Sequence, residues 1–555
     1  MKTERELILK HALVNAVEHN GKADTKAVLG KVIAEDPSVK SRIKEIIDEI
    51  KEAVKKVNSL SVEQQNKELN KMKVKIEKKG RKEEKYELPE LPNAKLGKVI
   101  TAFPPEPSKF PHLGHAKAAL INFLYAKKYK GKFVLRFEDS NPAVAKKEYY
   151  QAILNGMKWL EIKWNKIDFL SNHLPEYYKT VDLLINGGEA YVCLCKQEEI
   201  KRKRAATEEC EHRNYSKEKN LELWKKMLKQ FKEGQATVRL KIDMTHLNAL
   251  MRDPSIVRII EASHPRTKNK YRVWPMYDFG TAMLDIWEKV THRIRSKEFE
   301  MRKELQQYIQ KLLGYSSPYI TEIGRFNIRG VPSSGRIIRE MIKNKELMGW
   351  DDPRLTTLIA LKRRGFTPEG IKNFLISTGV TKTEALLNWE PLEAENRKIV
   401  DPIANRYFIV LNPKKISIED APKLKIVTAP LHPEFPKRGK RKIAVDVKNV
   451  YIESDDLKNF GGKEVRLMDL FNVRLDEKAV FTTKQMKIEM QKIQWVSELH
   501  TKIKIIMPDG SIASGIAEPS IKNVKVGEIV QFIRTGFAKL DKGEKGNLVF
   551  YFSHK

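Results

Sequence analysis

Residues 103–115 read FPPEPSKFPHLGH, and this stretch decides the fold predicted for the chain. It ends the short apolar run VITAF at 99–103, which predicts a buried strand. It precedes AKAALINFLYAKKY at 116–129, whose apolar residues recur at helical spacing. A strand, a tight loop and a helix in this order form the corner at which doubly wound α/β domains bind phosphate groups.

The loop ends in two histidines, His112 and His115, with Gly114 between them. At this spacing both imidazoles can project from one side of the first helical turn. Gly114 leaves the backbone open to a flat ligand, and the helix N-terminus adds N–H groups and positive potential that suit phosphate. The pattern alone fits nucleotide binding and a pair of ordinary surface histidines equally well. Half a metal site is less favoured, because the nearby sequence has no carboxylate or third histidine at ligand spacing.

The composition indicates a soluble, multidomain protein of the cytosol. The 555 residues suggest about three to five domains. A net charge of +33 predicts a polyanionic partner, most simply nucleic acid, although a lysine-rich surface from an AT-rich or heat-adapted genome would give the same total. Three cysteines argue against a secreted disulfide framework, and the charged start MKTERELILK lacks a signal core. No apolar run approaches the roughly 18 residues of a membrane span.

The sequence pattern divides the chain into six segments. Residues 1–95 predict a helical domain that closes with the Lys- and Glu-rich stretch 67–85 and that could bind RNA or dock a protein. The remaining segments are a first α/β half at 96–190, an insertion at 191–270, a second α/β half at 271–315, a phosphate loop with a helical connector at 316–400, and a β-rich region at 401–555 that suggests β-barrels.

The insertion contains all three cysteines of the chain and a histidine at metal-ligand spacing. Cys193 and Cys195 form one close pair, and Cys210 and His212 form another, with 14 residues between the pairs. Two such pairs on separate hairpin arms suit a tetrahedral Zn²⁺ ion with a structural role. The alternative is a buried Cys193 and Cys195 with an unrelated Cys210.

Two further stretches point to ligand binding. Glu138 and Asp139 follow a strand predicted over 132–137, at the end where open α/β sheets bind ligands, although an Asx-turn into the next helix is the plain alternative. Residues 330–339, GVPSSGRIIR, form a small-residue loop that opens a helix and suits either phosphate binding or a simple N-cap with a basic surface. The runs 271–279 and 291–295 are expected to complete the same pocket.

Taken together, the motifs resemble the class I aminoacyl-tRNA synthetases, and more narrowly the archaeal-type glutamyl-tRNA synthetases. The matching stretches, in the family's order, are KHALVNAVEHNGKADTKAVLGKV (10–32), PPEPSKFPHLGHAKAALIN (104–122), VLRFEDSNP (134–142), AYVCLC (190–195), CEH (210–212), YRVWPMYDF (271–279), VTHRIR (290–295), GWDDPRL (349–355) and RRGFTPEGI (363–371). The resemblance runs nearly end to end. It implies a Rossmann-like catalytic domain, an acceptor-binding insertion and β-barrels that bind the anticodon.

The resemblance also implies an activity and a set of site residues. The enzyme would activate L-glutamate with ATP and Mg²⁺ to glutamyl-adenylate and transfer it to the 3′ end of tRNA(Glu), as a cytoplasmic monomer. By motif match, ATP would bind at Pro104, Pro105, His112, Gly114, His115, Ser334, Gly335 and Arg336, of which His112, His115 and Arg336 would be catalytic. The amino acid would bind at Asp139, Tyr277 and Arg295.

Two positions depart from the family pattern. Ala102 stands where the family usually has an arginine that binds the amino acid, so that Arg136 or Arg293 would have to compensate. Gly335 stands where the phosphate loop usually has a catalytic lysine, and Arg336 follows it. These departures keep a catalytically weakened tRNA-binding paralogue open as an alternative. A glutaminyl-tRNA synthetase is a second alternative, because that branch shares PMYDF and the β-rich C-terminus; tRNA(Gln) is also a candidate second substrate.

Overall fold

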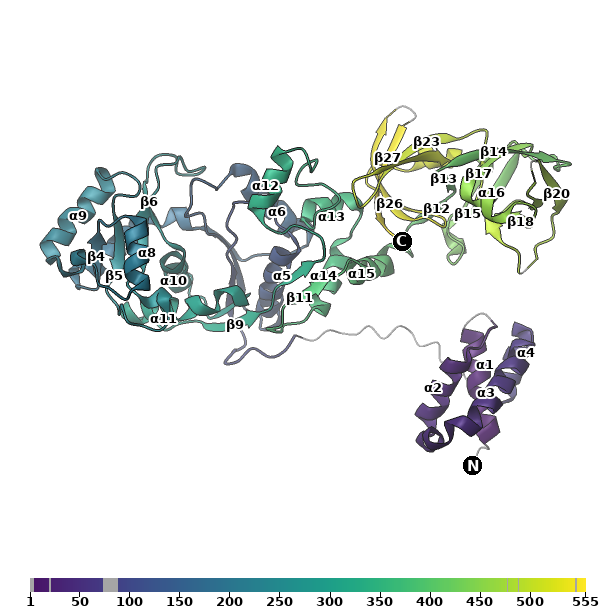
Figure 1. Ribbon diagram of the computed structural model, residues 1–555, viewed down its shortest axis with the longest axis horizontal. Coiled ribbons are helices and arrows are strands. Elements are labelled where there is room, and N and C mark those ends of the chain that lie inside the picture. Colours follow the sequence, from purple (N-terminus) through teal and green to yellow (C-terminus); the bar gives the residue numbers. More distant parts are fainter. Residues whose placement is uncertain (1–3, 19–20, 73–87, 477, 488, 545–546) are drawn as a thin grey trace. The chain divides into compact units, whose positions relative to one another are not determined.

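The structure, a computed structural model, describes residues 4–18, 21–72, 88–476, 478–487, 489–544 and 547–555 (Figure 1). The chain forms two compact units, Met1–Tyr86 and Glu87–Lys555, which are described separately below. None of the helices in the described ranges is long and apolar enough to cross a membrane.

The first unit is a helical bundle. Its elements are α1 (Glu4–Glu18), α2 (Thr25–Glu35), η1 (Pro37–Arg42), α3 (Ile43–Asn58) and α4 (Val62–Lys71). Helix α1 packs against the other three α-helices, and the buried core includes Ile8, Ala12, Val28 and Ile50. The side chain of Asp24 caps α2, and Ser61 with Gln64 closes α4 in a capping box. The helix predicted over 67–85 is present as far as Lys71, and 73–85 lie outside the described residues.

The second unit opens with a parallel sheet. Strands β1 (Ile100–Phe103), β2 (Lys132–Phe137) and β3 (Lys166–Phe169) pair in parallel, as do β8 (His292–Ser296) and β9 (Tyr319–Ile323). The Thr291 N–H donates to the Ile100 carbonyl at 3.0 Å, so that β8 lies beside β1 and the two α/β halves meet. The associated helices are α5 (Leu113–Lys128), α6 (Lys147–Trp159), η2 (Leu170–Asn172), α7 (Leu174–Asn186), α10 (Tyr277–Trp287), η5 (Lys297–Arg302) and α11 (Lys303–Leu312).

The insertion is built on an antiparallel sheet. Strands β4 (Ala190–Cys193), β5 (Thr237–Leu240), β6 (Ser255–Ile259) and β7 (Val273–Pro275) pair in that order. Helices α8 (Gln197–Ala205), η3 (Glu211–Asn214), α9 (Lys217–Lys229) and η4 (Ala249–Met251) complete it. The Trp224 and Trp274 side chains are fully buried in a core that the insertion shares with α7, α10 and α11, so the insertion packs directly on the second α/β half.

A connector joins the parallel sheet to the C-terminal region. It contains β10 (Phe326–Ile328) paired in parallel with β11 (Ala385–Leu387), and the helices α12 (Gly335–Lys343), α13 (Leu358–Arg364), α14 (Pro368–Ser377) and α15 (Glu390–Val400). At its other side the Arg363 guanidinium makes two hydrogen bonds to Asp541, with Nε–Oδ1 at 3.0 Å and Nη2–Oδ2 at 2.9 Å. This planar fork fixes α13 to the first C-terminal sheet.

The C-terminal region consists of two barrel-like sheets and a small hairpin. One sheet has the order β12-β25-β26-β27-β23-β24-β13, the other β21-β18-β19-β20-β14-β17-β22, and β15 pairs with β16. Their bounds are β12 (Asn405–Tyr407), β13 (Ile409–Val410), β14 (Pro413–Glu419), β15 (Ile426–Pro430), η6 (Pro436–Arg438), β16 (Lys440–Ala444), β17 (Asn449–Glu453), α16 (Ser454–Phe460), β18 (Glu464–Leu467), β19 (Asn472–Arg474), β20 (Ala479–Thr483), β21 (Lys492–Ile493), β22 (Val496–Ser497), β23 (Thr501–Ile506), β24 (Ile512–Ala517), η7 (Pro519–Asn523), β25 (Ile529–Phe532), β26 (Gly536–Glu544) and β27 (Asn547–His554).

Candidate active site

The two histidines close the N-terminus of α5. His112 is the N-cap residue, and its Nδ1 accepts a hydrogen bond from the Gly114 N–H at 3.0 Å. The Nδ1 of His115 accepts in turn from the His112 N–H at 3.3 Å. The imidazoles thus form a capping box, and their ring centroids lie 4.1 Å apart.

This capping fixes the protonation of both rings. A nitrogen that accepts a backbone N–H carries no proton, so each neutral imidazole has its proton on Nε2 and presents that N–H as a donor. Burial, with further contributions from the positive charges of Lys109 and Arg325, lowers the pKa of His112 to about 3. Burial likewise holds the pKa of His115 well below its ordinary value. Two neutral N–H donors at a helix N-terminus suit the oxygens of a phosphate.

Gly114 is required by the ring of its neighbour. A Cβ at this position would lie 2.8 Å from Cε1 and 3.1 Å from Nδ1 of His112. Any side chain here would therefore displace the imidazole that caps the helix. The missing side chain, predicted above to leave room for a flat ligand, also leaves room for the histidine.

The loop before the histidines is held by its surroundings. The Pro105 carbonyl accepts from the Glu138 N–H at 3.1 Å, which joins the loop to the end of β2.

The connector holds the loop from its other side. The Phe110 ring stacks on Trp350 with centroids 5.3 Å apart. The Leu358 N–H donates to the Pro111 carbonyl at 2.8 Å, and the Leu113 N–H donates to the Thr356 carbonyl at 3.1 Å. Pro104, which precedes Pro105, is half-buried at the end of β1. The loop is therefore fixed from both the sheet and the connector.

The second predicted loop lies against the first. Ser334 is the N-cap of α12, and Gly335 is buried at the first position of that helix. The Arg339 guanidinium donates to the Ser108 carbonyl at 2.7 Å, and the Lys109 ammonium lies 3.4 Å from the Ser333 carbonyl. Ser334 and Arg336 are exposed beside this junction. The structure thus brings together the two stretches that the sequence predicts to bind phosphate, although they lie more than 200 residues apart.

At the end of β2, Glu138 and Asp139 have different surroundings. Asp139 is fully buried and accepts from the Ser171 N–H, the Ser171 hydroxyl and the Tyr150 hydroxyl, each at 2.8 Å. Glu138 is 8% exposed and accepts from the Thr281 hydroxyl and from Arg136. Burial raises the pKa of Glu138. Asp139 orders the backbone around the pocket, and Glu138 is the carboxylate of this pair that retains some exposure.

Two buried arginines meet in front of Ala102. Ala102 is 1% exposed and packs against Val134 and Val290. The Arg136 Nη1 on β2 and the Arg293 Nη1 on β8 both donate to Asp285 Oδ1, at 2.9 and 2.8 Å. β2 and β8 lie on either side of β1, so the two arginines come from the two strands that flank the strand of Ala102.

Arg136 and Arg293 differ in the number of their carboxylate partners. Arg136 also donates to Glu288 at 2.9 Å and to Glu138 at 3.2 Å. Arg293 makes both of its short contacts through Nη1 to Asp285, and its Nη2 lies 3.9 Å from Glu138. The buried Nε of each arginine has no hydrogen-bond partner among the described residues, so the two differ in their terminal nitrogens. Arg293 has one close carboxylate partner, Asp285, whereas Arg136 has three.

Tyr277 and Arg295 lie at the same end of the sheet. The Tyr277 ring stacks on Phe299 with centroids 5.2 Å apart, and burial raises its pKa to about 12. The Arg295 Nη1 donates to Gln306 at 2.7 Å and its Nη2 donates to the Phe299 carbonyl at 3.0 Å. The charges of Arg293, Glu138 and Arg295 all act on the Tyr277 hydroxyl and contribute to its pKa.

The cysteines and His212 form one buried cluster in the insertion. The Cys210 Sγ lies 3.6 Å from Cys193 Sγ, 3.4 Å from Cys195 Sγ and 3.0 Å from His212 Nδ1. The four ligand atoms all lie within 4.8 Å of one another. Cys193 ends β4, which pairs with β5, and Cys195 follows it, whereas Cys210 and His212 lie at the start of the single turn η3 and not on a hairpin arm.

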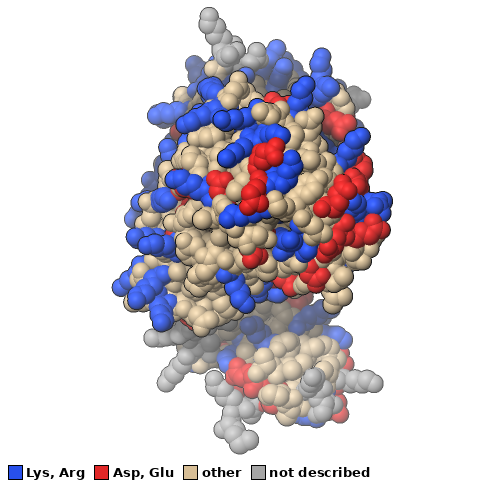
Figure 2. All heavy atoms as spheres, turned by 90° about the vertical axis from the view of Figure 1, so that its left-hand side faces the viewer, with Lys and Arg blue, Asp and Glu red and all other residues tan. Residues whose placement is uncertain are grey.

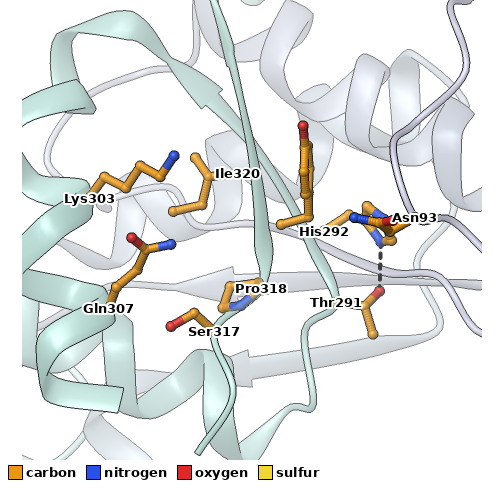
Figure 3. Close-up of a pocket in the computed structure, with 9 residues that line it drawn as sticks. Asn93, Thr291, His292, Lys303, Gln307, Ser317, Pro318 and Ile320 are labelled. Carbon is orange, nitrogen blue, oxygen red and sulfur yellow. Dashed lines mark hydrogen bonds between the residues drawn. The ribbon is translucent and has the colours of Figure 1, made fainter. Parts of the chain in front are cut away.

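A separate pocket of about 490 Å³ lies at the opposite end of β8 and β9 (Figure 3). It is lined by Asn93, Thr291, His292, Lys303, Gln307, Ser317, Pro318, Tyr319 and Ile320. The pocket lies where these parallel strands begin, at Thr291, His292 and Tyr319. The C-terminal ends of the strands, where Arg295 and the end of β2 lie, are on the opposite side of the sheet. This pocket is therefore distinct from the candidate active site.

Comparison with known families defines the class of the protein. Residues 98–402 match the catalytic domain of the class I tRNA synthetases (E and Q), and residues 404–491 and 492–541 match the anti-codon binding domains of the same group. The chain belongs to this family, as its motifs predicted.

Relatives that match over their full length show which branch of this family the chain resembles. The chain is 42% identical to a glutamate–tRNA ligase of Pyrococcus furiosus over 99% of both chains. It is 43% identical to that of Pyrococcus abyssi and 41% identical to that of Korarchaeum cryptofilum, each over all of both chains. The predicted resemblance to archaeal-type glutamyl-tRNA synthetases is confirmed.

The lowered pKa values of the histidine pair predict how stability depends on pH. Below the ordinary histidine value near 6.5 the unfolded chain takes up protons that the folded pair excludes, so the pair makes folding less favourable as the pH falls toward the folded-state pKa of about 3. We expect the unfolding midpoint to fall more between pH 8 and pH 5 in the native sequence than in His112→Asn/His115→Gln. This variant keeps capping-box chemistry without a titrating ring. Urea titrations at both pH values measure the difference; equal falls in the two proteins would contradict it.

Proposed function

We propose that this chain is a glutamate–tRNA ligase, which converts L-glutamate, ATP and tRNA(Glu) to glutamyl-tRNA, AMP and pyrophosphate. The observation that carries the proposal is the pair of imidazoles at the N-terminus of α5, each with its Nε2–H free to donate. The same end of the sheet carries Arg136 and Arg293, which differ in their number of carboxylate partners. The full-length similarity to archaeal glutamate–tRNA ligases supports the choice of amino acid and tRNA.

The first step joins glutamate to AMP. An α-carboxylate oxygen of glutamate attacks the α-phosphorus of ATP, which enters as its Mg²⁺ complex, and the bond to the bridging oxygen of pyrophosphate breaks. Negative charge develops on the phosphoryl oxygens and on the departing pyrophosphate, so catalysis needs positioned donors more than a covalent nucleophile. The Nε2–H groups of His112 and His115 supply two such donors. The exposed Ser334 and Arg336, with the backbone at Gly335, supply the far side of the phosphate site.

The second step transfers the acyl group. A hydroxyl of the 3′-terminal ribose of tRNA attacks the carbonyl carbon of glutamyl-adenylate, its proton passes to the phosphate of the leaving AMP, and AMP departs with the electron pair of the broken C–O bond. Pro104 and Pro105 shape the loop under the nucleotide, and Gly114 keeps it open. The product ester stays on the tRNA end, which must reach the same pocket.

Glutamate binds in the pocket between β1, β2 and β8. Its ammonium group contacts the Glu138–Asp139 pair, in which Asp139 fixes the backbone and Glu138 offers the accessible oxygen. Tyr277 and Arg295 border the amino acid. The side-chain carboxylate pairs with Arg293, because Arg136 already has three close carboxylate partners, whereas the Nη2 of Arg293 lies 3.9 Å from Glu138. A guanidinium from β8 thus replaces the arginine that the family carries at position 102.

The insertion and the C-terminal sheets contact the tRNA. Helices α8 and α9 carry Lys201, Arg202, Lys203, Arg204, Lys225 and Lys226, and Figure 2 shows Lys and Arg side chains spread over the face that includes these helices. Positive charge of this kind binds the phosphate backbone without reading bases. Residues 404–541 match the anti-codon binding domains, so base recognition is assigned to them. We place the enzyme in the cytoplasm as a monomer.

The cysteine cluster holds a structural zinc ion. Zn–S bonds of about 2.3 Å in a tetrahedron require sulfur atoms about 3.7 Å apart, which the Cys210 contacts of 3.4 and 3.6 Å approach. The donor set of Cys193, Cys195, Cys210 and His212 leaves no position for a substrate, so the ion would stabilise the insertion and take no part in catalysis.

The function is tested by aminoacylation. We expect the purified protein, with ATP and Mg²⁺, to attach radiolabelled glutamate to tRNA(Glu), and to attach glutamine to neither tRNA(Glu) nor tRNA(Gln). Charging of tRNA(Gln) with glutamate would extend the substrate range to both tRNAs. Charging with glutamine would identify the glutaminyl branch instead, and salt-sensitive tRNA binding without any charging would identify a binding paralogue.

The role of Arg293 is tested by its substitution. Arg293→Gln removes the cation that pairs with the side-chain carboxylate but leaves an amide to contact Asp285. Because a charged hydrogen bond contributes about 1.5–3 kcal/mol, we expect the KM for glutamate to rise about 10- to 100-fold while the KM for ATP changes little. Arg258→Gln, at an exposed position of β6, is the matched control. An unchanged KM for glutamate in Arg293→Gln would reject the assignment.

The zinc site is tested by metal analysis. We expect about one zinc ion per chain in the native protein and almost none in Cys210→Ser, with a lower thermal midpoint after chelation because zinc binding contributes to folding. Inductively coupled plasma mass spectrometry measures the metal content. The control is His246→Gln, which changes a histidine of the insertion outside the cluster. Equal, low zinc contents in all three proteins would leave the cluster as packed thiols.

A further inference from the structure

The position where the family carries its loop lysine is covered by another lysine. A Cβ added to Gly335 would lie 2.9 Å from Cδ and 3.1 Å from Cβ of Lys109. The aliphatic stem of Lys109 therefore crosses the first turn of α12, in the space that a side chain at position 335 would occupy. Position 335 needs glycine because Lys109 lies there.

The ammonium group of Lys109 lacks a close counter-charge. Its Nζ lies 3.4 Å from the Ser333 carbonyl, and no carboxylate of the described residues lies within the 4.0 Å of an ion pair. Burial lowers the pKa of Lys109, the positive charge of Arg325 lowers it further, and the carboxylates of Glu106 and Glu298 act from farther away to raise it. A half-buried cation with one weak neutral contact can still bind an anion.

The charge of Lys109 reaches both histidines. It contributes to lowering the pKa of His112 and of His115, as does the charge of Arg325. The Arg339 guanidinium, which donates to the Ser108 carbonyl, approaches the same junction from α12. Lys109 thus contacts the N-terminus of α12 from the loop that carries the two histidines, where the pyrophosphate part of ATP would bind if the proposed function holds.

We propose that Lys109 is a catalytic residue that takes over the task of the missing loop lysine. Its ammonium donates hydrogen bonds to oxygens of the β- and γ-phosphates as the bond from the α-phosphorus to the bridging oxygen breaks, and it keeps its proton throughout. Compared with the family pattern, the cation is supplied by the loop before α5 and not by α12. The aliphatic stem of Lys109 occupies the space beside position 335 in which a lysine side chain would begin. The same space cannot hold both lysines, because a Cβ at 335 meets the stem of Lys109 at 2.9 Å.

The first test removes only the charge. Lys109→Met keeps an unbranched stem over Gly335, so the packing at α12 should survive. Loss of one donor to a developing charge costs about 10²- to 10³-fold in kcat. We expect such a fall in glutamate- and tRNA-dependent ATP–pyrophosphate exchange, with little change in the KM for glutamate. Lys343→Met, an exposed lysine in the last turn of the same helix, should keep the native rate. A native rate in Lys109→Met would overturn the proposal.

The second test moves the lysine back. Gly335→Lys alone should be impaired, because its Cβ meets the stem of Lys109 and two cations compete for one place. Lys109→Gly/Gly335→Lys should recover most of the activity that Lys109→Gly loses. If the double variant is no more active than Lys109→Gly alone, the two positions do not share one task and the proposal fails.

Binding of inorganic pyrophosphate separates this inference from the proposed function. By calorimetry we expect Lys109→Met to bind pyrophosphate about ten-fold more weakly than the native protein and Lys343→Met. If the native protein activates no glutamate, the proposed function fails, and Lys109 is judged on this titration alone. Equal pyrophosphate affinities in native protein and Lys109→Met would reject Lys109 as a phosphate ligand.

Discussion

The capping box at the start of α5 is the interaction on which the site depends. A helix N-terminus leaves N–H groups without partners, and here two imidazoles satisfy two of them through Nδ1. That local requirement sets the tautomer of both rings, turns both Nε2–H groups outward and keeps the rings neutral. The chemistry expected at the phosphates therefore follows from the way the helix begins, and Gly114 is fixed by the same ring.

For both departures from the family pattern, another element carries a cation nearby in the fold. Arg293 lies on β8, the strand beside the one that carries Ala102, and Lys109 in the loop before α5 covers Gly335 on α12. At Gly335 the stem of Lys109 occupies the space that a side chain would fill.

Much of the architecture could be predicted from local pattern, and the pairings between distant segments could not. The strand predicted over 132–137 is β2, and the four zinc-ligand candidates lie together, because periodicity and close spacing are local signals. Within the region 401–555, which was predicted to be β-rich, Asp446 accepts from the Lys448 N–H where the chain turns between β16 and β17. The contact of Lys109 with position 335 joins residues more than 200 apart, and a lysine in the first loop gave no sign of it. Likewise, the burial of Asp139 depends on Ser171 and Tyr150, which its own dipeptide does not reveal.

Helix α13 has a mechanical role that neither of its ends shows by itself. Its first residue, Leu358, donates to the Pro111 carbonyl in the loop before the histidine pair, and its last residue, Arg364, donates to the Ser553 carbonyl of β27 at 2.6 Å. Arg363 beside it donates two hydrogen bonds to Asp541 on β26. The helix, two turns long, thus links the first C-terminal sheet to the loop that leads into α5. A displacement of that sheet therefore shifts this loop unless hydrogen bonds at one end of the helix break.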